Sequence, residues 1–364
     1  MKMRKRCLGL AFGLFFLAGC SGTDLQPKET ADGTVAEAPP ADDAAVENDQ
    51  IKEDAAMSDP FEEVIAQEHS KMEVEAVEAE EGEERIPTAE IAEKIPPKYT
   101  AIRSDEAGRI EKISYTSRDY FGDGAEVEKE ANVYLPAGYD ESKKYNVLYL
   151  MHGIGGDENE WGMTSNASRV KCIMDNLAYY GDIEPFIVVT PNGRSAANHA
   201  ANGSDFNSFY CFGEELRNDL IPYVESHYST YAEEGADLSA SRDHRAMAGL
   251  SMGGMQTINI GIGECLDLFA WFGAFSAAPT SNTAQRTAEL LGNTDLDIHY
   301  FYNICGTEDE IAYASAAAAA KELPAACPLF EEGKNFRWQE LPGRHDFDIW
   351  YLGFYNFAQI AFSE

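Results

Sequence analysis

The sequence predicts an α/β domain with a central, mostly parallel sheet of about eight strands flanked by helices. From residue 98 onward, short apolar runs separated by Gly, Asn and Asp turns alternate with stretches of helical pattern. The later runs are continuous in Val, Ile, Leu and Phe, which is typical of parallel strands covered on both faces. The expected strands are residues 110–115, 131–135, 147–151, 186–190, 244–250, 269–275, 298–304 and 336–341; helices are expected at residues 169–180, 212–227, 252–261 and 312–323.

The first 20 residues have the pattern of a bacterial lipoprotein signal peptide. Four of the first six residues are basic, and they precede an apolar run at residues 8–17 that is too short to span a bilayer. The run ends in Leu-Ala-Gly-Cys, which resembles a lipobox, so Cys20 is the expected lipidation site. An ordinary signal peptide cut near Ala18 is the alternative. We therefore expect an extracytoplasmic, cell-surface lipoprotein that meets the membrane only through Cys20.

Residues 21–97 are rich in Ala, Glu, Asp and Pro and poor in aromatic residues. Such a segment cannot bury enough apolar surface to fold, so we expect an acidic, disordered linker between the signal peptide and a domain at residues 98–364. The whole chain carries a formal charge of -35. This charge repels phosphate backbones and anionic lipid heads, and it therefore weighs against nucleic acid as a partner and favours a neutral substrate.

The cysteines do not predict a metal site. Cys7 lies in the expected signal peptide and Cys20 is the expected lipidation site. No pair among the others has the C-x-x-C spacing of metal ligands. We expect core cysteines with at most two disulfides among Cys172, Cys211, Cys265, Cys305 and Cys327.

Residues 249–254, Gly-Leu-Ser-Met-Gly-Gly, contain the pattern G-x-S-x-G between an expected strand and an expected helix. This context is typical of the nucleophile turn of α/β hydrolases, in which the serine sits on a sharp strand-to-helix turn. Side chains at the flanking positions would clash with the neighbouring strand and helix, a constraint that Gly249 and Gly253 satisfy. Ser251 is therefore the predicted nucleophile.

A serine hydroxyl needs a base to take its proton, and in α/β hydrolases this base follows the serine in the chain. Two histidines, His299 and His345, meet this condition. His299 lies inside an apolar run, where a core position is more common. His345 lies in a turn directly after the last expected strand, which is where these enzymes place the base. We predict His345.

The group that orients the base should be a carboxylate at the same edge of the sheet. Asp309 follows the strand that ends near residue 304, so it is expected to emerge beside Ser251 and His345. Asp309 is therefore the predicted acid. The alternatives, which have the same charge and lie in the same two segments, are Glu308, Glu310, Asp346 and Asp348.

The oxyanion formed during acyl transfer needs two backbone amides, one after the nucleophile and one from the loop after the third strand. Met252 is the first expected donor. The second is expected from residues 152–156, His-Gly-Ile-Gly-Gly, with Ile154 as the candidate and His152 as a structural anchor. The loop lacks the Lys and Ser/Thr of a P-loop, so nucleotide binding is not expected.

Six segments together resemble carbohydrate esterase family 1, and in particular the feruloyl esterase domains of bacterial xylan-degrading enzymes. They are residues 134–139, 149–156, 189–192, 248–254, 305–309 and 345–350, and the likeness covers residues 110–362. The resemblance implies the α/β-hydrolase fold and hydrolysis of feruloyl or acetyl esters on plant polysaccharide such as xylan, without metal or organic cofactor. Carried over by position, the catalytic triad falls on Ser251, Asp309 and His345.

Two tryptophans near these loops, Trp161 and Trp350, are the candidates for stacking on a phenolic ring or a sugar. A packing role is the alternative for each. The sequence thus predicts a secreted, lipid-anchored serine esterase that works through an acyl-enzyme. Two other functions stay open: an acyltransferase or small-molecule (siderophore) esterase of the same fold, and a catalytically silent glycan-binding lipoprotein.

Overall fold

The computed structural model describes residues 90–201, 206–292 and 294–363. The expected signal peptide, Cys20 and most of the expected linker lie outside these residues. Within the described part of the chain, no helix is long and apolar enough to cross a membrane.

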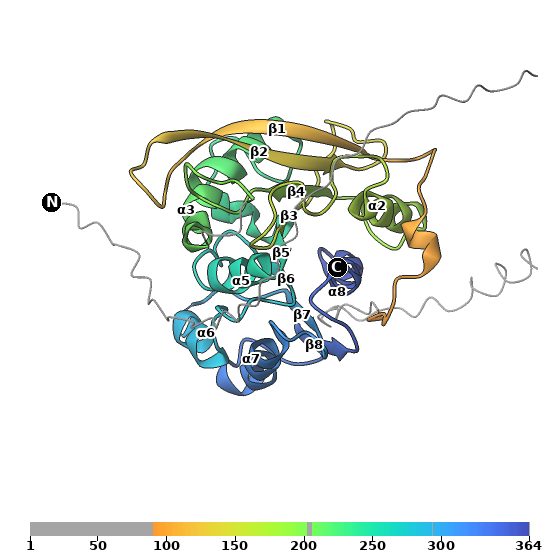
Figure 1. Cartoon of the computed structure of the whole chain (residues 1–364). Helices are drawn as coiled ribbons and strands as arrows, with labels where there is room; N and C mark the ends of the chain where they lie inside the picture. The colour runs from red at the N-terminus through yellow and green to blue at the C-terminus, as the bar shows by residue number, and fades with distance from the viewer. Residues whose placement is uncertain (1–89, 202–205, 293, 364) are drawn as a thin grey trace, which may run out of the picture. The chain divides into compact units, whose positions relative to one another are not determined.

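Eight strands form a single sheet in the order β1-β2-β4-β3-β5-β6-β7-β8. β1 and β2 pair antiparallel, β2 pairs antiparallel with β4, and the other neighbours are parallel (Figure 1). This arrangement confirms the predicted eight-stranded, mostly parallel sheet. The strands are β1 (Arg109–Arg118), β2 (Glu126–Leu135), β3 (Val147–Met151), β4 (Ile187–Pro191), β5 (Arg245–Leu250), β6 (Trp271–Phe275), β7 (Tyr300–Gly306) and β8 (Phe336–Leu341).

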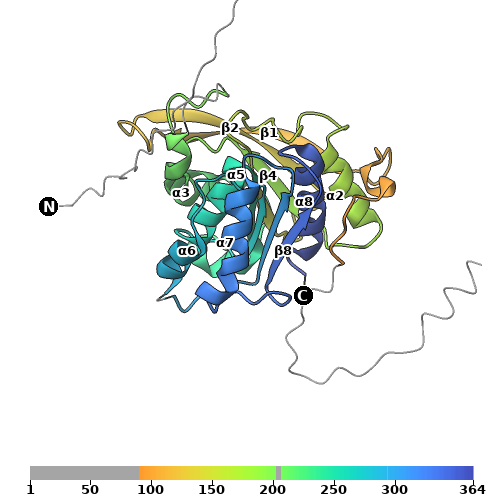
Figure 2. The ribbon, with the colours of Figure 1, turned by 60° about the horizontal axis from the view of Figure 1, so that its bottom comes forward.

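Helices cover both faces of the sheet (Figures 1 and 2). α2 (Arg169–Tyr179) and α8 (Phe347–Ile360) pack on one face. The other face carries α3 (Phe212–Glu215), η3 (Leu216–Leu220), α4 (Ile221–His227), α5 (Met252–Gln256), η5 (Thr257–Ile262), α6 (Ala284–Leu291) and α7 (Tyr313–Ala326). Short 3-10 turns lie at η1 (Pro97–Thr100), η2 (Asn207–Cys211) and η4 (Leu238–His244).

The central strands are apolar on both faces because each face is covered. On β3, Val147, Tyr149 and Met151 join the core under α4 and η5, whereas Leu148 and Leu150 join the core under α2 and α8. All five side chains are buried. The continuous apolar run in the sequence is therefore explained by two separate cores on opposite sides of one strand.

Two helices were not among those expected from the sequence, α6 and α8. α8 is buried over most of its length and so lacks the polar face that makes a surface helix recognisable. Its first turn is fixed by Asp346, whose carboxylate accepts a hydrogen bond from the Asp348 N–H. The turn predicted around His345 therefore leads directly into a helix.

The packed chain begins before residue 98. The Ala92 N–H donates to Asn356 Oδ1 (3.0 Å), and the side chains of Asn356 and Gln339 both donate to the Ala92 carbonyl. Ile91 and Ile95 pack against the core under α8. The C-terminal end of the segment expected to be a linker is therefore attached to the domain.

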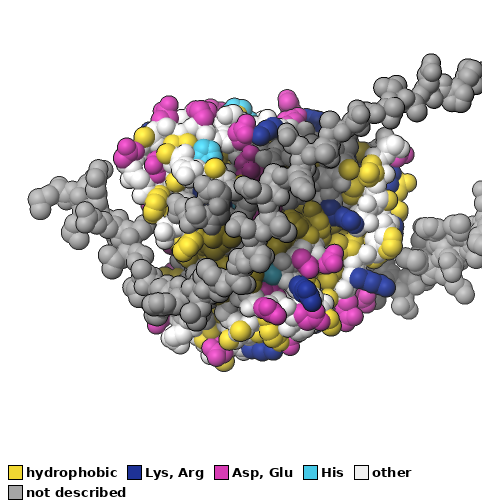
Figure 3. Space-filling view, viewed as in Figure 1, with side chains coloured by type: hydrophobic (Ala, Val, Ile, Leu, Met, Phe, Trp, Pro, Cys, Tyr) yellow, Lys and Arg dark blue, Asp and Glu magenta, His cyan; other side chains and the backbone are white. Residues whose placement is uncertain are grey.

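The five cysteines at positions 172, 211, 265, 305 and 327 are all buried, and no disulfide joins any two of them. On the face seen in Figure 3, apolar side chains gather near the centre and acidic side chains lie at many points around them. This distribution agrees with the acidic composition of the chain.

Candidate active site

Ser251 lies at the turn between β5 and α5 with φ +50° and ψ −112°, a conformation that costs free energy for a residue with a side chain. The end of β6 holds this turn in place. The Ser251 N–H donates to the Phe275 carbonyl (2.9 Å), and the Ala278 N–H donates to the Ser251 carbonyl (2.9 Å). These bonds keep Ser251 in the strained turn expected of a nucleophile.

The two glycines that flank Ser251 are required by close backbone approach. A Cβ at Gly249 would lie 2.6 Å from the Gly253 carbonyl carbon, and one at Gly253 would lie 2.5 Å from the Met151 carbonyl oxygen. Both distances are far below contact. The steric reason for the sequence pattern is therefore present in the structure.

Ser251, His345 and Asp309 come from three loops and form one chain of hydrogen bonds. The Ser251 Oγ lies 3.0 Å from His345 Nε2, and His345 Nδ1 lies 2.7 Å from Asp309 Oδ2. Ser251 is only 8% exposed. This is the geometry in which a carboxylate orients an imidazole that accepts a serine proton. The catalytic roles of these residues stay predictions.

The Asp309 carboxylate is buried and well supplied with donors. Its Oδ1 accepts hydrogen bonds from the N–H groups of Ile311 (2.9 Å) and Ala312 (2.8 Å), while its Oδ2 accepts from His345. Burial by itself raises the pKa of a carboxyl group, but here these hydrogen bonds outweigh it and lower the pKa of Asp309 below its usual value. Asp309 is therefore ionised at neutral pH.

The alternative acids and the alternative base are not part of this chain of hydrogen bonds. Glu308, Glu310 and Asp348 are exposed, and Asp346 is used as the cap of α8. His299 precedes β7, so it lies at the amino end of the parallel strands, with its Nε2 3.4 Å from an Asp243 carboxylate oxygen. The structure thus brings together the three residues that the sequence singled out.

The glycine-rich loop (residues 152–156) runs directly past the nucleophile. A Cβ at Gly153 would lie 3.4 Å from Ser251 Cβ, and Ile154 packs in the small apolar cluster that contains Met252. In the described part of the chain, neither the Ile154 N–H nor the Met252 N–H donates to a protein acceptor. These are the two amides that the sequence predicted as oxyanion donors.

His152 anchors this loop, as expected, and does not reach Ser251. Its Nδ1 lies 2.6 Å from the Gly153 carbonyl, and its Nε2 accepts a hydrogen bond from the Gly193 N–H (2.9 Å). Full burial lowers the pKa of His152 to about 4. The imidazole is therefore neutral, which is required for Nε2 to accept this bond.

Two further side chains hold the loop, and the sequence analysis missed both. Glu160 Oε2 accepts from the Gly153 N–H (2.5 Å), and Arg194 donates to the carbonyls of Ile154 and Gly156. Burial raises the pKa of Glu160. The available signals were weak: an acidic residue shortly after a glycine-rich loop, and an arginine just beyond the carboxyl end of a strand.

Of the two tryptophans proposed to contact substrate, Trp161 lies in the core. Trp161 is 0% exposed, its indole N–H donates to the Met151 carbonyl (3.0 Å), and its ring packs among Phe275, Phe347 and Phe354. The expectation that Trp161 contacts substrate is therefore wrong: it is a core residue.

Trp350 is also largely buried, but its ring lies edge-on to the His345 ring at 5.1 Å between centroids. It can restrain the imidazole, and its contact with a substrate stays a prediction.

In the described residues, no group of three or more His, Cys, Asp or Glu side chains is arranged to hold a metal ion.

The sheet order and the strained serine turn after β5 define the class of protein: the chain is an α/β hydrolase. Within that class, the Esterase family model matches residues 125–340, which is more than half of the chain. The chain therefore belongs to the Esterase family.

Relatives with curated names are larger proteins. Endo-1,4-beta-xylanase Y of Acetivibrio thermocellus is 39% identical over 239 residues, which cover 64% of this chain and 20% of the relative. Endo-1,4-beta-xylanase/feruloyl esterase of Xylanibacter ruminicola is 34% identical over 197 residues, covering 50% of this chain and 24% of the relative. The chain thus matches between a fifth and a quarter of the length of these proteins.

Solved structures of single modules match over nearly their full length. The feruloyl esterase module from Clostridium thermocellum, complexed with sinapinate, is 33% identical with a TM-score of 0.64; the match covers 77% of this chain and 96% of that one. The CE1 ferulic acid esterase of Anaeromyces mucronatus is 27% identical with a TM-score of 0.62, covering 75% and 98%. These matches confirm the fold and the family resemblance drawn from the sequence.

Proposed function

We propose that this domain hydrolyses carboxylic esters, with Ser251 as nucleophile, His345 as general base and Asp309 as the group that orients the base. The observation that carries this proposal is the continuous chain of hydrogen bonds from Ser251 through His345 to the buried, ionised Asp309. A serine on a strained turn with a correctly placed imidazole is the arrangement that makes a weak nucleophile reactive.

In the first half of the reaction, Ser251 Oγ attacks the ester carbonyl carbon and its proton passes to His345 Nε2. The carbonyl oxygen becomes an oxyanion and accepts hydrogen bonds from the amides of Met252 and Ile154. The tetrahedral intermediate collapses, the C–O bond to the alcohol breaks, and His345 returns the proton to the leaving oxygen. The acyl group is then bound to Ser251.

In the second half, water takes the place of the alcohol. His345 removes a proton from the water as the water attacks the acyl carbon, and then protonates Ser251 Oγ as the acid leaves. Asp309 keeps the His345 Nδ1–H in place throughout and stabilises the imidazolium that forms in each half. No cofactor is needed for either step.

The proposed substrate is a feruloyl or acetyl ester on plant polysaccharide such as xylan. This choice is supported by the printed names of the relatives, which are xylanases and feruloyl esterases. The half-buried Ile154 and Tyr210, which pack on the cluster of Met252 and Phe209 beside Ser251, offer an apolar wall that suits an aromatic acyl group.

The proposed location is the outer surface of the cell, with a lipid on Cys20 and the acidic segment as a spacer. The sequence of the first 20 residues and the composition of the next 70 support this part of the proposal. Replacement of Cys20 by Ser should release the protein from the membrane fraction into the soluble fraction. Continued membrane association of Cys20→Ser would contradict the anchor.

The enzymatic proposal is tested by comparing wild type with Ser251→Ala on four substrates: 4-nitrophenyl acetate, methyl ferulate, arabinoxylan and acetylated xylan. Wild type should release ferulate or acetate, and Ser251→Ala should lose nearly all activity while keeping its melting temperature. Activity of Ser251→Ala within about tenfold of wild type would refute the nucleophile. Wild-type turnover of the nitrophenyl ester without release from either polysaccharide would instead favour a small-molecule esterase.

A further inference from the structure

The glycine-rich loop has to be rigid if the Ile154 amide is to act as an oxyanion donor, yet three of its five residues are glycine. Inside the loop, one backbone hydrogen bond is formed, from the Gly156 N–H to the Gly153 carbonyl at 3.3 Å. The direction of the Ile154 N–H must therefore be set by side chains, since the loop's own backbone bonds are too few to fix it.

The peptide groups on both sides of Ile154 are held by buried side chains. The Gly153 carbonyl lies 2.6 Å from His152 Nδ1, and the N–H of the same planar, trans peptide group is that of Ile154, which therefore points the opposite way. The following carbonyl, that of Ile154, accepts from Arg194 Nη2, and Arg194 Nη1 donates to the Gly156 carbonyl (2.6 Å). One guanidinium thus fixes two carbonyls of the loop.

Arg194 itself is held firmly. It is 1% exposed and its guanidinium lies over the Phe209 ring, 4.8 Å from the centroid. It belongs to the bridging loop (residues 192–195), which follows β4. In this loop the Gly193 N–H donates to His152 Nε2 (2.9 Å), and the Gly193 carbonyl accepts from Gln256 Nε2 (2.8 Å).

Gln256 lies on α5, the helix whose first residue is Met252, the other proposed oxyanion donor. The bridging loop is therefore bonded to both halves of the proposed oxyanion site: to the glycine-rich loop through Arg194 and His152, and to the helix after Ser251 through Gln256. No other segment that we find in the described residues is bonded to both.

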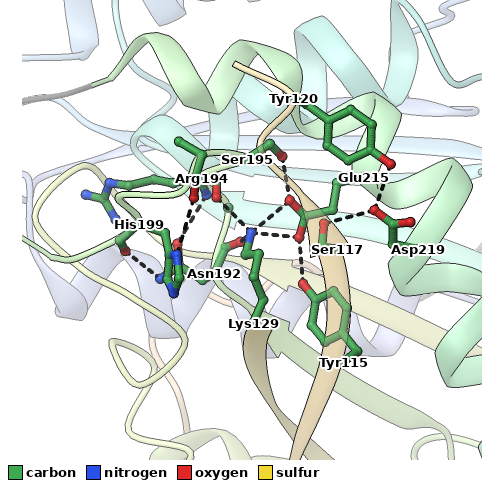
Figure 4. A network of polar contacts seen from close by, with 12 residues as sticks. Tyr115, Ser117, Tyr120, Lys129, Asn192, Arg194, Ser195, His199, Glu215 and Asp219 are labelled. Carbon is green, nitrogen blue, oxygen red and sulfur yellow. Dashed lines mark hydrogen bonds and ion pairs between the residues drawn. The ribbon is translucent and has the colours of Figure 1, made fainter. Parts of the chain in front are cut away.

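A buried network of charged side chains is hydrogen-bonded to the bridging loop (Figure 4). Lys129 Nζ donates to the carbonyls of Asn192 and Arg194, both at 2.7 Å, and to Glu215 Oε2 at 2.8 Å. Lys129 and Glu215 are both 0% exposed. Glu215 also accepts hydrogen bonds from Ser195 and Tyr115, so its charge is fully compensated.

We propose that Arg194 is a positioning residue for the oxyanion site: its guanidinium, held by the bridging loop and the Lys129–Glu215 pair, fixes the glycine-rich loop so that the Ile154 N–H faces the oxygen of the carbonyl group whose carbon Ser251 attacks. This inference rests on the proposed function of the same site. It goes beyond the triad because the guanidinium of Arg194 acts through the backbone carbonyls of another loop, those of Ile154 and Gly156.

The test compares Arg194→Met with Arg194→Lys on 4-nitrophenyl acetate. Loss of one oxyanion donor lowers kcat by about 10²–10³, so Arg194→Met should reach that range with KM changed less than about threefold. Lys keeps the charge and the apolar stem but donates as a single point, so Arg194→Lys should recover part of the lost kcat. A role in folding alone would lower the melting temperature and leave kcat of the folded fraction unchanged.

A second measurement separates the oxyanion site from general damage. Phenylboronic acid forms a tetrahedral adduct when Ser251 Oγ adds to boron, and one boronate oxygen then occupies the oxyanion position. Its inhibition constant should rise with the loss of kcat in Arg194→Met, because both depend on the same amide. If Arg194→Met does not fold, Arg194→Lys serves the same comparison, with a loss of kcat of at least about tenfold expected.

Arg245→Met is the matched control, because Arg245 is also 1% exposed and bonded to a carboxylate and to backbone carbonyls, but lies at the opposite end of β5. It should lose stability and keep kcat within about threefold. Unchanged kcat and boronate binding in folded Arg194→Met or Arg194→Lys would overturn the inference, as would an equal loss of kcat in Arg245→Met. A wild-type protein that does not hydrolyse the ester would refute the proposed function instead.

Discussion

The two ends of β5, a strand of six buried residues, differ in backbone strain and in how well their polar groups are hydrogen-bonded. At the amino end, Arg245 has ordinary extended backbone angles, φ −122° and ψ 134°. Its guanidinium donates to both Glu225 carboxylate oxygens, to Ser241 Oγ and to the carbonyls of Leu238 and Leu268. At the carboxyl end, Ser251 has a positive φ, and the N–H of Met252 beyond it donates to no protein acceptor in the described residues.

The difference shows how structural and chemical polar groups can be told apart within one strand. A buried charge that has all its partners and a relaxed backbone contributes to a stable fold. A strained residue next to donors without protein partners costs stability, and such a cost is typical of sites where chemistry occurs. Variants at the two ends should therefore affect different properties, the rate at one end and the stability at the other.

The largest effect is expected at the base. His345→Ala should lower kcat/KM by about 10⁶, because among the described residues no other imidazole is placed to take the Ser251 proton. His299→Ala, at the amino end of the strands, should stay within about threefold of wild type. Initial rates on 4-nitrophenyl acetate measure both. If His299→Ala were the inactive variant, the assignment of the base would be wrong.

The next effect is expected at the acid. Asp309→Asn keeps the size of the side chain but removes the charge that holds the His345 Nδ1–H, so kcat should fall by about 10⁴. Glu310→Gln, an exposed neighbour, serves as the control and should have the activity of wild type. If Glu310→Gln were inactive while Asp309→Asn kept its activity, Glu310 would be the residue that orients His345.

At the amino end, Arg245→Met should affect stability and not rate. Removing one partner of a buried ion pair costs about 3–5 kcal/mol because the other charge, here Glu225, is left uncompensated. Urea unfolding should show this loss in the free energy of unfolding. A change below about 0.5 kcal/mol would mean that water replaces the arginine and that this end of β5 is less tightly packed than the structure shows.

The smallest of the four effects concerns pH and His152. The pKa of His152 is about 4 in the folded state, against about 6.5 for an unperturbed histidine, so the unfolded chain binds more protons between these values. The stability contributed by the neutral imidazole is complete above pH 6.5 and is lost as the pH falls toward 4. Between pH 7 and pH 5 this amounts to about 2 kcal/mol.

A His152→Gln variant lacks this titration and should therefore lose less stability between pH 7 and pH 5 than wild type does. Parallel losses in the two proteins, measured by urea unfolding at both pH values, would show that His152 is not kept neutral by burial. Because other groups titrate in both proteins alike, the difference between the two curves isolates His152.

The sequence predicted much of this fold because strand composition and chain order carry the information. Continuous apolar runs marked the strands, and the serine-acid-histidine order placed Ser251, Asp309 and His345 at one edge of a parallel sheet. α8 was missed because a helix buried on most sides shows no periodic polar face. Local sequence pattern is enough to predict a strand or helix whose side-chain environment follows a regular period along the chain.

The residues that support the site could not be found in this way. Glu160 and Arg194 act on backbone carbonyls and amides, and which carbonyl lies near a side chain depends on the packing of distant segments. Trp161 was misassigned for the same reason, since an aromatic residue beside a loop looks the same in the sequence whether it faces the solvent or the core. Three-dimensional packing decides these cases.

The five buried cysteines make local opening of the domain measurable by thiol labelling. A thiol inside the core reacts with a maleimide only after the surrounding segment has opened, so the labelling rate at each position measures the free energy of local opening. Cys172 lies on α2, Cys305 on β7 beside Asp309, and Cys327 just after α7, so the positions sample both faces of the sheet. Mass spectrometry of labelled peptides would then show which face opens first.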